Sequence, residues 1–273
     1  MHPTACAHRD TTAQHLKTGP MLGSLFGAES SSGSEASGGE GFALPFATPW
    51  PADHGPEDAP PPSGELDAET VLRAGGLNVR LAQQGNTLVA KGGVCWGAAR
   101  ALCALFAADP DRADLAGKRV LELGAGTGAV GLWIALAYPT ARVTLTDLAE
   151  ALPLLRTNRD LNGLADQVRV MELAFGDPIP EPFDVIIGSD LLYSVRCEVA
   201  WRPLAVTLAS APSGVITWFA IQERYGCRVQ DLEAFFDAIH GLSRRSTEVL
   251  RGDVARYAGD LGAATPLRVV QTQ

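Results

Sequence analysis

Three glycines and two acids within one stretch, VLELGAGTGAVGLWIALAYPTARVTLTDL, have the types and spacing to hold a ligand. Gly124, Gly126 and Gly128 follow a strand-like run, Glu122 precedes them, and Asp147 ends the next strand-like run. Glycine at such a turn allows positive φ and lets a ligand approach the backbone closely. A carboxylate at the end of the neighbouring strand is able to accept hydrogen bonds from two hydroxyl groups. The stretch therefore predicts a site for a ribose-containing ligand.

Two ligands fit this glycine turn. In dinucleotide sites the loose G-x-G-x-x-G/A pattern, matched by Gly124, Gly126 and Ala129, places a helix N-terminus against a pyrophosphate. S-adenosylmethionine carries ribose and adenine without phosphate, and its methionine tail would lie where the glycines leave room. The E-x-G-x-G-x-G order from Glu122 resembles motif I of the seven-β-strand methyltransferases, which favours S-adenosylmethionine. The alternatives are a solvated strand-end acid for Glu122 and a helix N-cap for Asp147.

A second polar group follows the apolar run in FDVIIGSDLLYS. Ser189, Asp190 and Tyr193 stand where a strand with only a structural role would simply turn. This placement indicates a functional group of side chains. The alternative is that Asp190 caps the next helix and that Tyr193 is a half-buried residue at its edge.

The elements that must position these residues alternate between strands and helices. CWGAARALCALFAAD has helical spacing that stops at Pro110, and NVRLAQQGNTLVA, with its Gly-Asn turn, predicts a small hairpin. This order implies an α/β fold with a parallel sheet covered on both faces and ligands outside the carboxyl ends of the strands. Residues 124–128, 147 and 189–193 then share one rim. We expect strands near 118–123, 141–146, 167–173, 183–188, 214–221, 245–257 and 266–271, and helices near 127–138, 149–161, 196–210 and 229–240.

Composition divides the chain into two parts. Residues 1–64 are rich in Ser, Gly, Pro and Ala, and such a segment buries too little apolar surface to offset the entropy of ordering. We predict a disordered tail over 1–64 and one folded domain over 65–273. The five cysteines show no metal-ligand spacing and form an odd set, which predicts reduced thiols and no metal site.

Charge and hydropathy narrow the partners. The net charge of −9 does not favour binding to phosphate backbones, so we expect no nucleic-acid partner. No apolar run reaches the roughly 20 residues of a membrane helix, so we expect no membrane partner. The predicted location is the cytoplasm, with the nucleus, or an organelle reached through the tail, as alternatives.

Six motifs in order resemble one family. VCWGAARALCALFA, VLELGAGTGAVGLWIA, VTLTDL, LLRTNRDLNG, MELAFGD and FDVIIGSDLLY are similar, in order and spacing, to the family-16 protein methyltransferases, which mostly methylate lysines of proteins. The resemblance covers about residues 85–240. It implies the Rossmann-like class I methyltransferase fold, with a mostly parallel seven-stranded sheet and S-adenosylmethionine as cofactor.

The resemblance also implies the residues around the cofactor. Asp147 would hold the ribose, and Ser189 would contribute backbone near the adenosyl group. Phe175 stands where the family usually has Trp, which keeps an aromatic face for adenine but loses an indole N–H donor. The full set implied for the cofactor is Trp96, Glu122, Gly124, Ala125, Gly126, Asp147, Phe175 and Ser189.

Asp190 and Tyr193 match the family's D-x-x-Y motif, which lies nearest to the methyl acceptor, so they are the predicted catalytic residues. Methyl transfer is an in-line displacement, and the accepting nitrogen must be neutral and aligned. For a lysine of pKa about 10.4, the neutral form costs about 4.6 kcal/mol at pH 7. Because a nearby carboxylate raises the pKa of a lysine, we expect Asp190 to position the amine and not to remove its proton.

The predicted function is N-methylation of a lysine side chain in a protein substrate. Three alternatives stay open: methylation of a small-molecule amine, methylation of a protein histidine, and a non-catalytic scaffold with the same fold. Adenine methylation is disfavoured because Leu191 and Leu192 replace the prolines of the [DN]-P-P-[YF] motif. Neither the substrate's identity nor the oligomeric state follows from the sequence.

Overall fold

The structure, a computed structural model, describes residues 67–84, 92–192, 197–222, 232–235, 237–238, 248–251 and 267–272. The predicted tail over 1–64, the Gly85–Asn86 turn and Tyr193 lie outside these residues. None of the helices described is long and apolar enough to cross a membrane. The described ranges also hold no group of three or more metal-ligating side chains.

A seven-stranded sheet forms the centre of the domain, in the order β5-β4-β3-β6-β7-β9-β8. The first five strands of this order pair in parallel, whereas β9 is antiparallel to both of its neighbours. This is the predicted Rossmann-like class I methyltransferase sheet. Its strands are β3 (Arg119–Leu123), β4 (Arg142–Asp147), β5 (Val168–Glu172), β6 (Val185–Ser189), β7 (Ile216–Gln222), β8 (Glu248–Arg251) and β9 (Leu267–Thr272).

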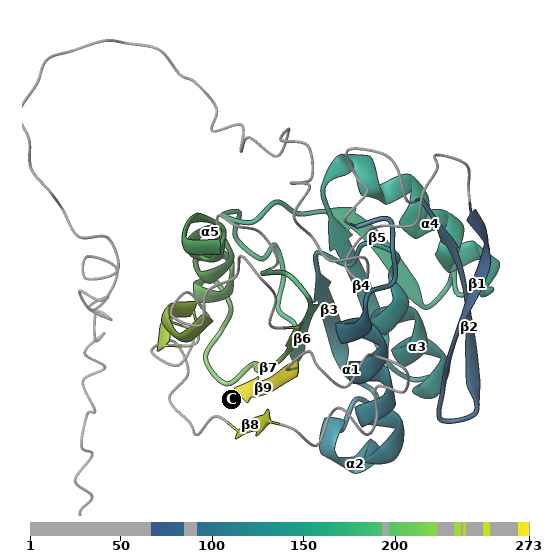
Figure 1. The fold of residues 1–273 in the computed structure, drawn as a ribbon, viewed down its shortest axis with the longest axis horizontal. Helices are drawn as coiled ribbons and strands as arrows, with labels where there is room; N and C mark the ends of the chain where they lie inside the picture. The colour runs from purple at the N-terminus through teal and green to yellow at the C-terminus, as the bar shows by residue number, and fades with distance from the viewer. Residues whose placement is uncertain are drawn as a thin grey trace, which may run out of the picture. The chain divides into compact units, whose positions relative to one another are not determined.

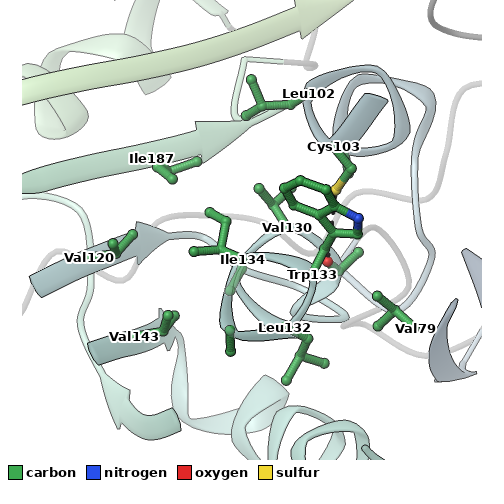
Figure 2. Close-up of a cluster of buried hydrophobic side chains, with 14 of the residues drawn as sticks. Val79, Leu102, Cys103, Val120, Val130, Leu132, Trp133, Ile134, Val143 and Ile187 are labelled. Carbon is green, nitrogen blue, oxygen red and sulfur yellow. Dashed lines mark hydrogen bonds between the residues drawn. The ribbon is translucent and has the colours of Figure 1, made fainter. Parts of the chain in front are cut away.

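Helices cover both faces of the sheet, because the strands are apolar on both sides. In β3, Val120 belongs to one buried cluster, while Leu121 and Leu123 belong to the other. The helices α1 (Gly97–Ala108), α3 (Ala129–Ala137) and α4 (Leu152–Leu161) share the cluster of Val120, and Figure 2 shows its centre around Trp133. The helix α5 (Cys197–Ala209) and the helical residues 232–235 share the other cluster, on the opposite side in Figure 1.

A hairpin precedes the sheet, as predicted, and its turn lies at Gly75–Gly76. Strands β1 (Asp67–Ala74) and β2 (Leu77–Gln83) pair around Gly75 and Gly76, which have φ of +58° and +78°. Glycine adopts positive φ at little cost, so the two residues accept this tight turn. Strand β2 packs on α3 and α4, outside the helical layer (Figure 1).

The remaining helices are short. The predicted stop of α1 is confirmed, but Pro110 also begins α2 (Pro110–Ala113). Proline suits the first turn of a helix, and the Asp109 carboxylate caps α2 by accepting the Arg112 N–H at 3.2 Å. The predicted helix over 149–161 begins with a 3-10 turn, η1 (Ala149–Ala151), before α4.

Candidate functional site

The glycine turn between β3 and α3 is held by neighbouring backbone on two sides. The Ala125 N–H donates to the Thr146 carbonyl at 2.8 Å, which ties the turn to the end of β4. Gly124 and Gly126 have φ of +55° and +57°, where side chains cause strain. A Cβ on Gly126 would lie 2.6 Å from the carbonyl oxygen of Gly92, so the chain before α1 passes directly over this residue.

Asp147 joins the end of β4 to the same turn. Its Oδ2 accepts the Gly126 N–H and its Oδ1 accepts the Leu148 N–H, both at 2.8 Å. Burial raises the pKa of Asp147 above its usual value, although the two N–H donors act in the opposite direction. Each carboxylate oxygen has further lone pairs, so the group is able to accept two hydroxyl protons of a ligand. This geometry is compatible with the predicted ribose role. The alternative, an N-cap of the following helix, is not found, because the N-cap of the next helical turn (149–151) is Leu148 and no side chain caps it.

Glu122 is directed at helix α3 and is fully buried, which excludes the solvated alternative. Its Oε2 accepts the N–H of Gly131, in the first turn of α3, at 2.8 Å. Burial raises the pKa of the Glu122 carboxyl to about 8, with the Gly131 N–H lowering it and the Asp147 charge raising it. The residue thus stabilises the helix that follows the glycine turn, and its interaction with a ligand would be through Asp147 and that helix.

An apolar wall faces Gly124 from two other strand ends. A Cβ on Gly124 would lie 2.7 Å from Leu191 Cδ2 and 3.3 Å from Phe175 Cζ. The half-buried Phe175 therefore has its ring at the glycine turn, as the aromatic position of the motif predicts. Ser189 is the last residue of β6 and pairs with Ala220 of β7.

Asp190 adopts an unusual backbone conformation at the next position. Its φ is +57°, its side chain is 5% exposed, and its N–H donates to the Ala220 carbonyl at 2.7 Å. Positive φ is costly for a residue with a Cβ, and such strain concentrates at functional sites. Its predicted partner in the D-x-x-Y motif, Tyr193, lies outside the described residues. Trp96, half-buried, precedes the first residue of α1 in the segment that continues from Gly92.

The structure thus brings together the predicted residues from four strand ends along one rim: Gly124, Ala125 and Gly126 after β3, Asp147 at β4, Phe175 after β5, and Ser189 and Asp190 at β6. The rim combines the half-buried Asp147 carboxylate, the Phe175 ring and a glycine turn with positive φ. Such a site suits a ligand with a ribose and a flat ring. A metal would need further donors, and no such group exists among the described residues.

Asn158 of α4 was not predicted from the sequence, although it contacts the glycine turn from outside this rim. Its buried amide donates to the Thr127 carbonyl at 2.9 Å, so it supports the glycine turn directly. A signal was present in the sequence. Asn158 stands three residues after the buried Leu155, on the apolar face of an amphipathic helix, where an unpartnered amide would be costly.

Residues 76–240 match the protein family described as lysine methyltransferase, and this segment contains every described residue of the site. A protein N-lysine methyltransferase METTL21A of Danio rerio is 40% identical over 128 residues, which are 44% of this chain and 56% of the relative. An EEF1A lysine methyltransferase 3 of Xenopus tropicalis is 34% identical over 122 residues, which are 43% of this chain and 53% of the relative. The chain therefore spans about half the length of these relatives.

Among solved structures, magnesium protoporphyrin IX methyltransferase from Synechocystis PCC 6803, described with bound SAH, is 13% identical with a TM-score of 0.46. That match covers 65% of this chain and 84% of the other.

Proposed function

This chain belongs to the lysine methyltransferase family, and we propose that it transfers a methyl group from S-adenosylmethionine to a lysine nitrogen of a protein substrate. The observation that carries the proposal is the family match over residues 76–240, which includes the glycine turn, Asp147 and Asp190. Two relatives are named as methyltransferases of protein lysines, one of them for EEF1A. We also propose a cytoplasmic location, which agrees with the two buried free thiols of Cys95 and Cys103.

In this proposal the residues of the rim bind the cofactor. Asp147 accepts the two ribose hydroxyls through the lone pairs that Gly126 and Leu148 leave available. Phe175 offers its ring to the adenine, and the methionine end lies along the glycine turn, where positive φ at Gly124 and Gly126 lets a ligand approach the backbone. S-adenosylmethionine supplies an activated methyl group on a sulfonium.

Asp190 is proposed to align the incoming lysine. The buried turn after β6 fixes this side chain at the rim through the Asp190 N–H bond to Ala220. A carboxylate there accepts hydrogen bonds from the amine and holds its lone pair towards the methyl group. The same charge raises the pKa of a lysine, so deprotonation to the neutral amine falls to solvent. Tyr193, three residues on, is proposed to orient the same nitrogen.

The test is a transfer assay with labelled S-adenosylmethionine, using purified EEF1A and, separately, a protein extract as acceptors. We expect label on a lysine side chain, located by mass spectrometry of the acceptor. Asp190→Asn should lower kcat about 100-fold, because the lost alignment affects the transfer step. The matched control is Asp184→Asn, a carboxylate at the amino end of β6 on the opposite edge of the sheet, which should leave kcat unchanged.

Other outcomes identify the alternatives. Label on a histidine or only on a small-molecule amine would replace lysine as the acceptor. An Asp190→Asn variant with full kcat would contradict the role of Asp190. Folded protein that neither binds the cofactor nor transfers label would favour the scaffold.

A further inference from the structure

Asn158 is a fully buried amide with a hydrogen bond for each of its polar positions. Its Oδ1 accepts the Ala82 N–H at 2.7 Å, and its Nδ2 donates to the Ala82 carbonyl at 3.1 Å. The second Nδ2 proton goes to the Thr127 carbonyl at 2.9 Å. The side chain therefore pairs with strand β2 of the hairpin as another strand would, and it also holds the glycine turn.

Asn162, one helical turn later, pairs with the same strand in the same way. Its Oδ1 accepts the Arg80 N–H at 2.9 Å and its Nδ2 donates to the Arg80 carbonyl at 2.8 Å. Its remaining amide proton goes to the Asn158 carbonyl at 2.7 Å, within α4. The two amides thus hold alternate residues of β2, but only Asn158 also reaches the glycine turn.

A second connection joins the hairpin to the same turn. The Gln84 N–H donates to the Gly93 carbonyl at 2.9 Å, and the Cys95 N–H donates to Gln83 Oε1 at 2.7 Å. Just before these residues, Gly92 lies against Gly126, with its carbonyl oxygen 2.6 Å from the place of a Cβ. This segment continues into Trp96.

The hairpin, the segment 92–96 and the glycine turn therefore form a closed ring of contacts. Two contacts join the glycine turn to the rest of this ring: Gly92 packs against Gly126, and the Asn158 amide donates to the Thr127 carbonyl. Gly126 is also the residue that donates to Asp147. A ligand that orders Asp147 and the turn must then order both contacts to the hairpin.

We propose that Asn158 is a positioning residue that couples S-adenosylmethionine binding at the glycine turn to the order of the hairpin β1–β2 and of the segment carrying Trp96. The proposal rests on the proposed function, since that function supplies the ligand. Coupling of this kind is reciprocal: the cofactor tightens the hairpin, and loss of the Asn158 bonds weakens cofactor binding.

Hydrogen exchange of the unaltered chain tests this coupling without any variant. Exchange of the residues 77–84 is followed by mass spectrometry with and without saturating S-adenosylmethionine, and binding is measured separately by calorimetry. We expect exchange at the Arg80 and Ala82 amides to slow by about fivefold or more with cofactor. Binding by calorimetry with unchanged exchange at 77–84 would overturn the coupling and leave the proposed function intact. Absence of binding would overturn both.

A pair of variants separates coupling from simple docking of the hairpin. Asn158→Asp replaces the Nδ2 donor with one acceptor oxygen that faces both the Ala82 and Thr127 carbonyls, and even a protonated carboxyl donates only once. We expect its Kd for S-adenosylmethionine to rise about tenfold or more, with the protection of 77–84 lost. Asn162→Asp disturbs the same strand one turn away, and its Kd should stay within about twofold.

Equal increases in Kd for the two variants would show that Asn158, like Asn162, only holds the hairpin against α4. That result would overturn the proposal. Thermal unfolding of both variants checks that they fold. If Asn158→Asp does not fold, the exchange experiment on the unaltered chain decides the question.

Discussion

Two acids at the carboxyl rim of the central sheet, where the parallel strands end, contrast with one acid at the amino rim, where these strands begin. At the carboxyl rim, Glu122 is fully buried and Asp147 is half-buried, and burial raises the pKa of both. At the amino rim, the side chain of Asp184 is 38% exposed, and its hydrogen bonds from Arg119 lower the pKa of Asp184 to about 2. A carboxyl with a raised pKa lowers stability when it ionises, whereas the exposed pair has only a small effect. The costly arrangement lies where the candidate site is, which agrees with a functional origin.

Residues with positive φ are more closely packed at the carboxyl rim than at the amino rim. Gly126 at the carboxyl rim has positive φ and a backbone neighbour where a side chain would be. Gly117 at the amino rim has φ of +72° but nothing within 4 Å of that place. Both rims contain a non-glycine residue with positive φ, yet Asp114 is exposed at the end of α2 and Asp190 is buried. Strain with close packing is thus a property of the carboxyl rim.

The largest expected effect is the pH dependence that the Glu122 carboxyl contributes to the free energy of unfolding. Between its usual pKa of 4.5 and its folded pKa of about 8, the unfolded chain loses this proton and the folded chain keeps it. The free energy of unfolding should therefore fall as pH rises through this range, by on the order of 4 kcal/mol. Glu122→Gln should remove most of this fall, as measured by urea unfolding at pH 5 and pH 8.

The exposed Glu172 provides the matched control, because Glu172→Gln should leave the pH dependence as in the unaltered chain. The same slope in Glu122→Gln and in the unaltered chain would show that the Glu122 carboxyl is ionised in the fold, and would remove this difference between the rims.

Alanine at the two glycines compares the packing of the rims. Gly126→Ala should lower the free energy of unfolding by about 3 kcal/mol, because the Cβ meets the Gly92 carbonyl and the residue keeps a strained φ. Gly117→Ala has only the strain of φ, so its cost should be about 1 kcal/mol. Chemical denaturation measures both values. Equal costs would mean that Gly92 moves away freely, and that the segment 92–96 does not close over the turn.

The smallest expected effect is at the ion pair of the amino rim. Asp184 accepts the Arg119 backbone N–H at 2.8 Å and two guanidinium protons, but the Arg119 and Asp184 side chains are 51% and 38% exposed. Asp184→Asn should lower the free energy of unfolding by less than about 1 kcal/mol at pH 7. Added salt should make this loss smaller, because salt screens an exposed ion pair. The lowered pKa means that this contribution is present above the usual pKa of Asp and is lost as pH falls towards 2.

Denaturation at pH 7 in low and high salt measures this effect. A loss of several kcal/mol that salt does not reduce would contradict the description of the amino rim as a weak, solvated surface.

The sequence predicted the sheet and the rim well, because both depend on local patterns. Apolar strands and helical spacing each repeat over short distances, and parallel strands bring residues 124–126, 147, 175 and 189–190 to one edge. For the elements between residues 118 and 222, the structure moved the ends by only a few residues. The N-terminal hairpin was predicted and is confirmed, with its turn at Gly75–Gly76, whereas the predicted Gly85–Asn86 turn lies outside the described residues.

Side-chain direction could not be predicted in the same way. The pattern placed Glu122 in the site, but its orientation towards Gly131 depends on the distance between β3 and α3. Asn158 contacts Ala82, 76 residues earlier in the chain, and no local pattern reports such a contact. Tyr193 lies outside the described residues, so its catalytic role remains a prediction.

The most direct test of the account is a calorimetric titration of the purified chain with S-adenosylmethionine, beside Asp147→Ala and the Asp184→Asn control. The account predicts saturable binding by the unaltered chain and by Asp184→Asn. It predicts a Kd roughly 100-fold higher for Asp147→Ala, which loses two hydrogen bonds to a charged group. Folded protein without binding, or equal binding by Asp147→Ala, would contradict the claim that the carboxyl rim is a cofactor site.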